Sequence, residues 1–320
     1  MKVPAATYLI VLCALAGCTP AVTETPTETP TPPTETSTPI ALPTETPRPT
    51  ATEALPVRIV AVGDVLMARS VNIGMIRRQD FTWPFQETAE LLQTPDLTLG
   101  NLEGPLLKYC RPTDGGDVMC GDERSLEGLT WAGFDVLSLA NNHTHDYGQN
   151  GFDTTKAFLD TTPISAVYPS NPTLKEVHGI RFAILAFDDS ETLVDEDAML
   201  TEVATTRPQA DVLIVMMHWG FEYHPTQSNR QTRLGHALVD AGANLVIGSH
   251  PHWRQPVEEY GGGIIFYSLG NFVFDQMWSE ETRRGNVADI TVTRTTDGFA
   301  FSYELVPIMI YLYGQPVIEK

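Results

Sequence analysis

Five apolar runs in this chain each end in a short cluster of polar residues, and this pattern constrains the fold more than any other feature. The runs have the length and continuous hydrophobicity of strands that are buried on both faces of a parallel sheet. In chain order, the clusters are Gly63-Asp64, Asn101-Leu102-Glu103, Asn141-Asn142-His143, His218-Trp219-Gly220 and Ser249-His250-Pro251-His252. Because ligands bind outside the carboxyl ends of the strands in an open α/β sheet, we expect the clusters to converge on one rim. Carboxylate, amide and imidazole groups at one rim predict a divalent-metal site.

These clusters resemble the CapA family of capsule or poly-γ-glutamate synthesis proteins, which is similar in turn to the calcineurin-like metallophosphoesterases. The segments that carry the resemblance are GDVLM from Gly63, GNLEGPL from Gly100, LANNHTHDYG from Leu139, the block from His218 to His252, and YSLGNFVFDQ from Tyr267. They cover roughly residues 57 to 280. The resemblance implies an α/β fold, a two-sheet metallophosphoesterase-like sandwich flanked by helices. Strand–helix alternation followed by antiparallel strands fits that architecture.

The resemblance also implies a centre of one or two divalent metal ions. The expected ligands are Asp64, Glu103, Asn142, His218, His250 and His252. Glu103 would bridge two cations, and His250 and His252 would bind one each, because alternate side chains of an extended segment point to the same side. Imidazoles combined with carboxylate and amide oxygens suit Zn, Mn or Fe better than Ca. A helix N-cap for Asp64 and a solvent-exposed loop position for Glu103 are the alternatives.

One position departs from the metallophosphoesterase pattern. Metallophosphoesterases usually carry a His two residues after the first Asp, where this chain has Leu66. One cation would then keep only Asp64, Glu103 and His252 as protein ligands. CapA-like chains share this departure, which favours that family over true phosphatases and leaves open both the number of metals and catalysis itself.

The cluster around Asn142 supplies the expected catalytic residues. In metallophosphoesterases the residue corresponding to His143 faces the substrate as an acid instead of binding metal, and Asp146 could orient His143 through its ring N–H. Candidate substrate contacts are Arg69, His224, Arg230, Arg254 and Asn271. Guanidinium groups bind carboxylate or phosphate through two N–H groups, and surface ion pairing is the alternative for each arginine.

The start of the chain is interpreted as a targeting segment. Residues 1–18 contain one charged residue, a short apolar stretch and the ending Leu15-Ala16-Gly17-Cys18, which resembles a bacterial lipobox. We expect cleavage before Cys18 and lipidation of that cysteine, which would anchor the protein outside the cytoplasm on the bacterial cell membrane. An ordinary secretory signal peptide is the alternative.

The next segment is predicted to be a linker. Residues 19–56 are mostly Thr and Pro with scattered Glu, so they have too few apolar side chains to form a core and are expected to be disordered. Residues 57–320 are long enough for one domain, which by the resemblance is a CapA-like metallophosphoesterase domain.

The charge and the cysteines narrow the choice of partners and compartment. The chain has 40 acidic and 20 basic residues and a formal net charge of −20 at pH 7, which argues against nucleic acid as a partner. A metal centre would have to supply the positive field for an anionic substrate. Cys110 and Cys120 lie in a Gly/Asp/Pro-rich loop. Outside the cytoplasm such a pair is expected to form a disulfide, and a Cys metal site is the alternative.

Together with the resemblance, these features predict a surface lipoprotein that acts as a metal-dependent hydrolase in capsule or poly-γ-glutamate metabolism. The bond cleaved would be a phosphoester or a γ-glutamyl amide. The alternative is a non-catalytic export or tethering factor for an anionic capsule polymer. The expected partners are an anionic polymer or phosphoester substrate, the membrane through the N-terminal lipid, and a polymer-synthesis or export complex.

The lipid anchor predicts a change of location in one variant. Cys18→Ser removes the acylated residue, so the protein should move from the membrane fraction to the soluble fraction of the producing bacterium, while the domain stays folded. Fractionation with immunoblotting measures the location. Wild-type protein found mainly in the culture supernatant with an unmodified N-terminus would contradict the anchor.

Overall fold

The computed structural model describes residues 55–319. The predicted signal segment, Cys18 and almost all of the predicted linker lie outside these residues. Within the described range, no helix combines the length and the hydrophobicity needed to cross a bilayer.

The strands form two large sheets and one short pair. The first sheet contains β1 (Val57–Val65), β2 (Leu97–Leu102), β5 (Val136–Ser138), β6 (Ser165–Val167), β13 (Asn271–Val273), β14 (Arg284–Thr295), β15 (Gly298–Tyr311) and β16 (Gln315–Ile318). Its order is β16-β15-β14-β1-β2-β5-β6, with β13 paired to β1. The second sheet contains β7 (Thr173–Val177), β8 (Ile180–Asp189), β9 (Val212–Trp219), β10 (Leu245–Ser249), β11 (Val257–Tyr260) and β12 (Gly263–Phe266), in the order β11-β12-β10-β9-β8-β7. The short pair is β3 (Leu106–Leu107) with β4 (Gly121–Asp122).

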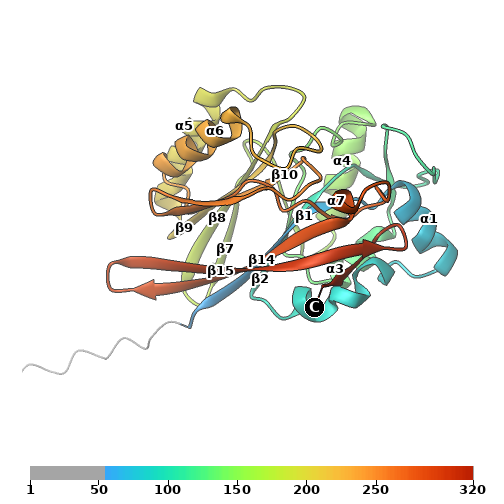
Figure 1. Ribbon diagram of the computed structural model, residues 1–320, viewed down its shortest axis with the longest axis horizontal. Coiled ribbons are helices and arrows are strands. Elements are labelled where there is room, and N and C mark those ends of the chain that lie inside the picture. The colour runs from blue at the N-terminus through green and yellow to red at the C-terminus, as the bar shows by residue number, and fades with distance from the viewer. Residues whose placement is uncertain (1–54, 320) are drawn as a thin grey trace, which may run out of the picture. The chain divides into compact units, whose positions relative to one another are not determined.

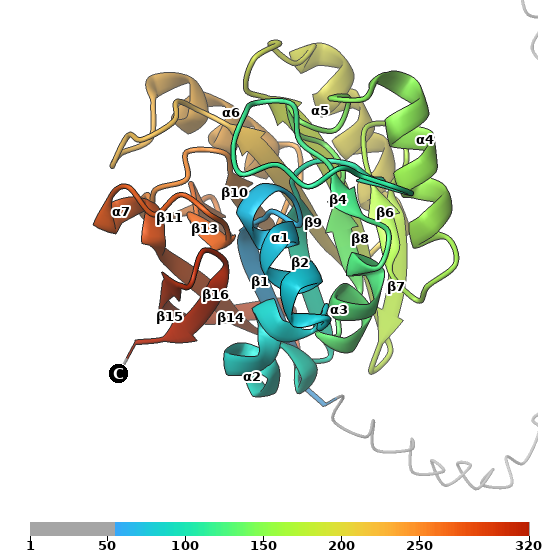
Figure 2. The ribbon, with the colours of Figure 1, turned by 90° about the vertical axis from the view of Figure 1, so that its right-hand side faces the viewer.

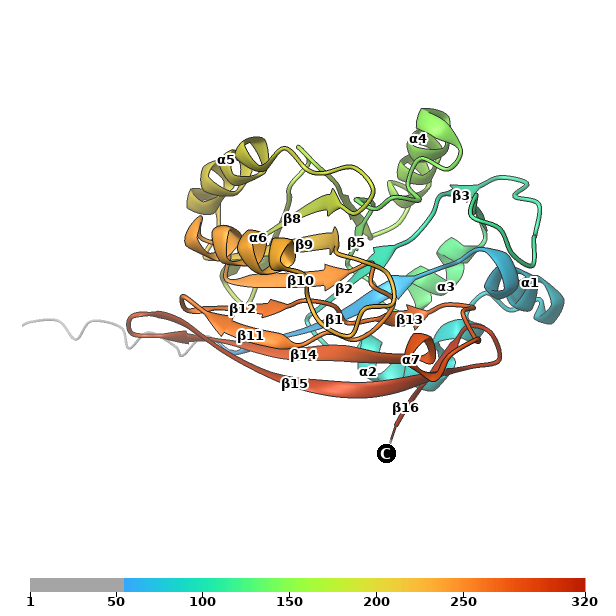
Figure 3. The same cartoon turned by 45° about the horizontal axis from the view of Figure 1, so that its top comes forward.

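The helices lie on the outer faces of the two sheets. They are α1 (Arg69–Arg78), α2 (Ala89–Gln93), α3 (Ser125–Trp131), α4 (Gly148–Leu159), α5 (Glu196–Thr206), α6 (Asn229–Asp240) and α7 (Glu280–Arg283), with 3₁₀ helices at Trp83–Thr88 and Arg207–Gln209. Side chains of α1 to α4 pack on the first sheet, and side chains of α5 and α6 pack on the second. Figure 2 shows α1 and α3 in front of β1 and β2, and Figure 3 shows α5 and α6 over β8, β9 and β10.

The two sheets stack as a sandwich (Figure 1), and strand side chains alternate between the apolar core between the sheets and the apolar cores under the helices. In β1, Ile59 and Ala61 pack in the core between the sheets, whereas Val60 and Val62 pack in the core under the helices. This alternation has the period of two that strands impose, and both faces are buried. The predicted fold class, an α/β two-sheet sandwich flanked by helices, is confirmed.

The five polar clusters meet at a rim that the two sheets share. The first three clusters lie at the carboxyl ends of β1, β2 and β5, which pair in parallel in the first sheet. The other two lie at the carboxyl ends of β9 and β10, which pair in parallel in the second sheet. Figure 3 shows these strands running in the same direction, so that their carboxyl ends lie on one side of the sandwich. The expectation of one rim is correct, although it is built from two sheets instead of one.

Between α1 and β2, the chain forms a 3₁₀ turn over Trp83–Thr88 and then the short α2. Strand β16 was not apparent from the sequence, because it contains Pro316. Pro is tolerated in strands at a sheet edge, and β16 is the edge strand of the first sheet.

The predicted disulfide is present. Cys110 and Cys120 are bonded, with their Cα atoms 5.9 Å apart, and they close the loop between β3 and β4. This loop also reaches the rim, because the Met119 backbone N–H donates to Asp146 Oδ2 at 2.6 Å.

Removing the disulfide should destabilise the domain moderately. A Cys110→Ser/Cys120→Ser variant frees a loop of about ten residues, which limits the loss to about 3 kcal/mol of unfolding free energy. Denaturant unfolding of the two proteins measures the difference. An unchanged midpoint together with two free thiols in the wild-type protein would show that the bond is not formed in solution.

Candidate metal centre

Two carboxylates are buried side by side at the rim. Asp64 lies near the end of β1 and Glu103 directly follows β2, and their exposed fractions are 0% and 1%. Asn101 is the parallel partner of Asp64 in the ladder and donates from Nδ2 to Asp64 Oδ1 at 2.9 Å. Ligand atoms of Asp64, Glu103 and His218 all lie within 4.8 Å of one another, which is a spacing that can hold a metal ion.

A second group of ligand atoms converges around His218. Its Nε2 is 2.9 Å from Asn142 Oδ1 and 3.2 Å from His250 Nδ1. Its other ring nitrogen, Nδ1, is 3.0 Å from Ser249 Oγ. Nε2 of His218, Nδ1 of His250 and the Asn142 oxygen therefore face a common point, as ligands of one cation do.

The third imidazole closes the other side of the carboxylate pair. His252 Nδ1 is 2.8 Å from Asn271 Oδ1 and 3.3 Å from Asp64 Oδ2. Its Nε2 is 3.7 Å from Glu103 Oε1. A hydrogen bond from Nδ1–H to Asn271 leaves the Nε2 lone pair directed toward Glu103. The structure thus brings all six predicted ligands into one cluster.

The backbone brings His250 and His252 to the cluster in a way that the sequence argument did not foresee. We expected an extended His-x-His segment, but φ is 94° at His250 and 56° at His252. Both residues are in the left-handed region, which is uncommon for residues other than Gly and is often found at functional sites. The expectation of an extended segment is wrong, because β10 ends at Ser249 and the chain turns there.

Burial and the neighbouring charges shift the pKa values of both carboxylates. Burial raises the pKa of Glu103 well above its usual range, and the neighbouring charge of Asp64 raises it further. Burial would also raise the pKa of Asp64, but a hydrogen bond and the charge of His252 bring it below its usual value. Among the described residues, neither carboxylate oxygen of Glu103 has a hydrogen-bond partner. Buried polar atoms without a partner are costly, and a divalent cation between these groups would satisfy them.

The imidazoles of His218 and His250 are neutral, which is the state that binds metal. Burial lowers the pKa of His218 well below its usual value. Burial, with the charge of His252, lowers the pKa of His250 to about 4. At neutral pH these rings therefore offer lone pairs without first releasing a proton. The donor set of carboxylates, an amide oxygen and imidazoles fits a transition metal such as Zn, Mn or Fe.

The expected catalytic pair lies at the edge of the cluster. His143 Nδ1 is 3.0 Å from Asp146 Oδ2, so the predicted contact between the two side chains is present. His143 Nε2 faces the cluster at 4.0 Å from Glu103 Oε1. With 16% of its side chain exposed, His143 can be reached by a substrate from solvent.

Two of the proposed substrate contacts have other structural partners. Arg230 forms ion pairs with Asp189 and Glu196, which is the alternative considered for it. Asn271 is buried and accepts from His252 through Oδ1, while its Nδ2 donates to the Thr282 carbonyl at 2.9 Å. Asn271 therefore orients a candidate ligand and does not face a substrate.

The other three proposed contacts have different surroundings. Arg69 pairs with Asp275 at 2.7 Å, and its charge acts to lower the pKa of Glu103. Arg254 is partly buried and donates to Asn286 Oδ1 at 3.3 Å without a carboxylate partner among the described residues. His224 is exposed, and its ring lies against Phe221.

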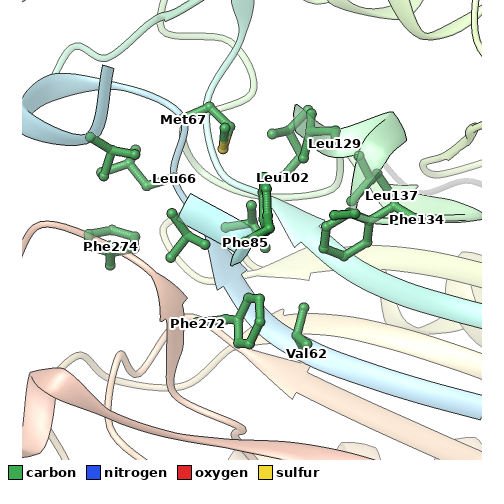
Figure 4. Packing of buried hydrophobic residues seen from close by; sticks show 14 of the residues in the cluster. Val62, Leu66, Met67, Phe85, Leu102, Leu129, Phe134, Leu137, Phe272 and Phe274 are labelled. Carbon is green, nitrogen blue, oxygen red and sulfur yellow. The ribbon is translucent and has the colours of Figure 1, made fainter. Parts of the chain in front are cut away.

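Leu66 occupies the position at which the metallophosphoesterase pattern has a His. Leu66 is fully buried in the apolar cluster under the first sheet, which also contains Phe272 and Phe274. Figure 4 shows Leu66 and Phe274 at the same edge of this cluster. The position is therefore part of the hydrophobic core and offers no ligand atom.

The structure adds one carboxylate that the sequence argument missed. Glu222 Oε1 is 3.9 Å from His252 Nε2, and the charge of Glu222 helps to raise the pKa of Glu103. The backbone N–H of Tyr223 donates to the Pro251 carbonyl, which ties the Glu222 loop to the His250–His252 turn. Glu222 lies between His218 and His250 in the chain but not at a strand end, so the pattern of strand-end clusters could not identify it.

Comparison with known proteins places this geometry in a sequence family. The model of the family described as "Bacterial capsule synthesis protein PGA_cap" matches residues 58–276. The "Capsule biosynthesis protein CapA" of Bacillus anthracis is 35% identical over an alignment of 272 residues that covers 76% of this chain and 62% of that protein. The "PGA biosynthesis protein CapA" of Bacillus subtilis is 31% identical over an alignment of 284 residues that covers 81% of this chain and 73% of that protein.

A solved structure is similar in fold. A hypothetical protein from Thermus thermophilus superposes with a TM-score of 0.51 at 17% identity and covers 78% of this chain and 99% of its own. At this identity the similarity shows the fold alone.

Metal binding should depend on Glu103. In wild-type protein, Mn²⁺ at about 100 times its dissociation constant should add about 2.7 kcal/mol of stability, or roughly 5–10 °C in Tm. Glu103→Gln should be as stable as wild type or more stable in chelator, because it removes a buried acid beside Asp64, and it should lose most of the Mn²⁺ shift. Thermal unfolding with and without Mn²⁺ measures both effects.

The matched control for this experiment is Glu304→Gln, the same change at an exposed position on β15. It should keep the full Mn²⁺ shift. An undiminished shift in Glu103→Gln would exclude Glu103 from the metal centre.

Proposed function

Because the chain belongs to the bacterial capsule synthesis protein family PGA_cap, we propose that it is a metal-dependent hydrolase of capsule or poly-γ-glutamate metabolism. The bond cleaved is a γ-glutamyl amide or a phosphoester. The names of the relatives, which refer to capsule and PGA biosynthesis, support a polymer as the substrate. The chain spans 62% of the length of the Bacillus anthracis relative, and the activity proposed here is that of the described domain.

One observation carries the proposal. Both carboxylate oxygens of Glu103 are buried without a hydrogen-bond partner among the described residues, and imidazole nitrogens face them from two sides. Surface carboxylates and ordinary N-caps do not show this arrangement, because folding normally pairs buried polar atoms. Ligands from five separate chain segments converge on this point, which favours a built site.

Different residues of the chain have different roles in the proposed reaction. Divalent cations at these ligands would supply the Lewis acidity that activates water and stabilises negative charge. Asp146 accepts the Nδ1–H of His143 and stabilises the protonated ring, which carries its second proton on Nε2 and can give that proton to the leaving group. Asn271 holds His252 in the tautomer with a free Nε2. Partial exposure of His143 lets a polymer reach the site from its open side.

The proposed location is outside the cytoplasm, with the domain tethered to the cell membrane through lipid on Cys18 and a Thr/Pro-rich linker. The lipobox-like sequence and the Cys110–Cys120 disulfide support it, because disulfides persist in oxidising compartments. A polymer-synthesis or export complex is the proposed partner in that compartment.

A non-catalytic role in polymer export or tethering is the second candidate. The observation that favours it is Leu66, which replaces a usual metal ligand with a buried apolar side chain. In this role the metal would bind polymer carboxylates without cleaving a bond.

Replacing His143 separates the two candidates. His143→Ala should keep the metal content of wild type, because His143 is not a proposed ligand, and should lose at least about 100-fold of the hydrolysis rate, the range of a general acid. His145→Ala, the same change at the exposed histidine two residues later, is the matched control and should keep both. Metal analysis is paired with assays on poly-γ-glutamate chain length and on a phosphodiester.

The outcomes are distinct. Equal metal loss in His143→Ala and Glu103→Gln would make His143 a ligand. Metal-loaded wild-type protein that binds polymer but cleaves neither substrate would support the export or tethering role.

A further inference from the structure

A second concave surface lies along α1, apart from the proposed ligands. It is an open groove of about 1050 Å³, formed by one face of α1, the disulfide loop and the turn between β15 and β16. The α1 residues that line it are spaced three or four apart, which places them on one face of the helix. The lining of the groove includes Arg77, Arg78, Arg111, Leu312 and Tyr313.

The charge of this groove is opposite to that of the whole chain. The chain has a formal net charge of −20, yet three arginines line the groove with one carboxylate, Asp114. Within residues 55–319, Arg77 and Arg111 make no ion pair and no side-chain hydrogen bond, whereas half of the arginines there are paired with carboxylates. The last turn of a helix favours cations, which accounts for Arg77 and Arg78. It does not account for Arg111, which comes from a different loop.

The walls of the groove are held in place by other contacts. The Arg78 guanidinium stacks 4.0 Å from the centre of the Trp83 ring and donates to the Gly74 carbonyl at 3.1 Å. Arg111 directly follows the disulfide residue Cys110. The groove therefore presents cationic groups on fixed elements, which lowers the entropy that a ligand must overcome on binding.

The third wall is apolar and also fixed. Leu312 and Tyr313 are 59% and 55% exposed and lie in a turn packed on α1. A Cβ on Gly314 would lie only 2.7 Å from Val71 Cγ2, so the turn approaches the helix closely. Cationic groups opposite exposed apolar side chains suit a ligand with carboxylates on a partly apolar backbone.

The groove begins next to the metal centre. Its lining includes Ser70, and the preceding residue, Arg69, pairs with Asp275 and acts electrostatically on Glu103. At a rise of 1.5 Å per residue, α1 carries the groove about 12 Å from Arg69 to Arg77. A ligand that spans this distance can contact the arginines and the metal centre together, but a single amino acid cannot.

We propose that this groove binds a run of carboxylates in an anionic polymer and guides the chain toward the metal centre. The choice of a carboxylate polymer rests on the proposed function, whereas the site itself rests on the unpaired arginines. Guanidinium groups bind carboxylates through two N–H groups, and several such contacts along one chain reinforce one another. Affinity therefore rises with polymer length and falls with salt.

Polymer binding to the full-length protein in chelator tests the groove without the metal centre. Fluorescence anisotropy with labelled poly-γ-glutamate should show at least about tenfold weaker binding for Arg77→Ala/Arg111→Ala, because each lost contact is a charge-assisted hydrogen bond in partly screened surroundings. Arg78 is left in place because it packs on Trp83. Glutamate monomer should not compete at concentrations where the polymer saturates.

The matched control is Lys175→Ala/Arg294→Ala, which removes the same charge from β7 and β14. Figure 1 shows the β14–β15 hairpin at the end of the domain opposite α1. This variant should bind polymer within twofold of wild type. Circular dichroism and Tm show that both variants are folded.

Three results would contradict the proposal that the groove binds the polymer. They are unchanged affinity in Arg77→Ala/Arg111→Ala, an equal loss in the control variant, and equal binding of polyphosphate and poly-γ-glutamate. The test is independent of the metal proposal. Glu103→Gln should bind polymer normally in chelator, so failure of metal binding leaves the groove standing, and failure of the groove leaves the metal centre standing.

Discussion

The buried contact between Asp64 and Glu103 is the constraint on which the rest of the rim depends. Two carboxylates without exposure to water repel each other and cannot both be ionised without positive charge nearby. Asp64 accepts hydrogen bonds from the Asn101 side chain and the His250 backbone N–H, whereas both oxygens of Glu103 lack a partner among the described residues, and Arg69 is the arginine that acts on Glu103. A divalent cation would supply the missing charge, and the other features of the rim would position ligands for it.

The polar groups next to the ligands are fixed by bonds to one another. Asn141 bridges the Asn101 side chain and the Leu102 carbonyl, and Asn271 ties His252 to the Thr282 carbonyl. Gln255 accepts from Gln231 of the α6 capping box and donates to the carbonyls of the Glu222 loop. These contacts connect both sheets and α6 to the rim, so the ligand geometry is set before a metal binds.

The distribution of charge links the two proposals. An acidic domain repels an anionic polymer at long range, so it needs local positive charge where the polymer is to bind. The proposed metal centre would provide it at one point, and the arginines along α1 would provide it over a longer path. Leu66 keeps the core under α1 apolar, and its side chain offers no ligand atom to the proposed centre.

The sequence by itself predicted the buried strands, and its resemblance to a known family supplied the candidate ligands. Continuous apolar runs specify buried strands, and the polar residues directly after them, such as Asp64, Glu103 and His218, are therefore placed at strand ends. The bond between Cys110 and Cys120 was likewise predicted, from their place in a Gly/Asp/Pro-rich loop of a chain expected outside the cytoplasm. These features are local, because they depend on a residue and its neighbours in the chain.

Only the tertiary structure decided which groups meet across the sandwich. The shared rim of two sheets, the left-handed turn at His250 and His252, and the approach of Glu222 to His252 arise from packing between distant segments. Contacts between distant segments also pair Arg230 with Asp189 and Glu196. They bring Arg111 to the same groove as Arg77. The partners of a side chain depend on long-range contacts that no local periodicity encodes. The sequence therefore showed which residue types are present, but only the fold showed which role each one has.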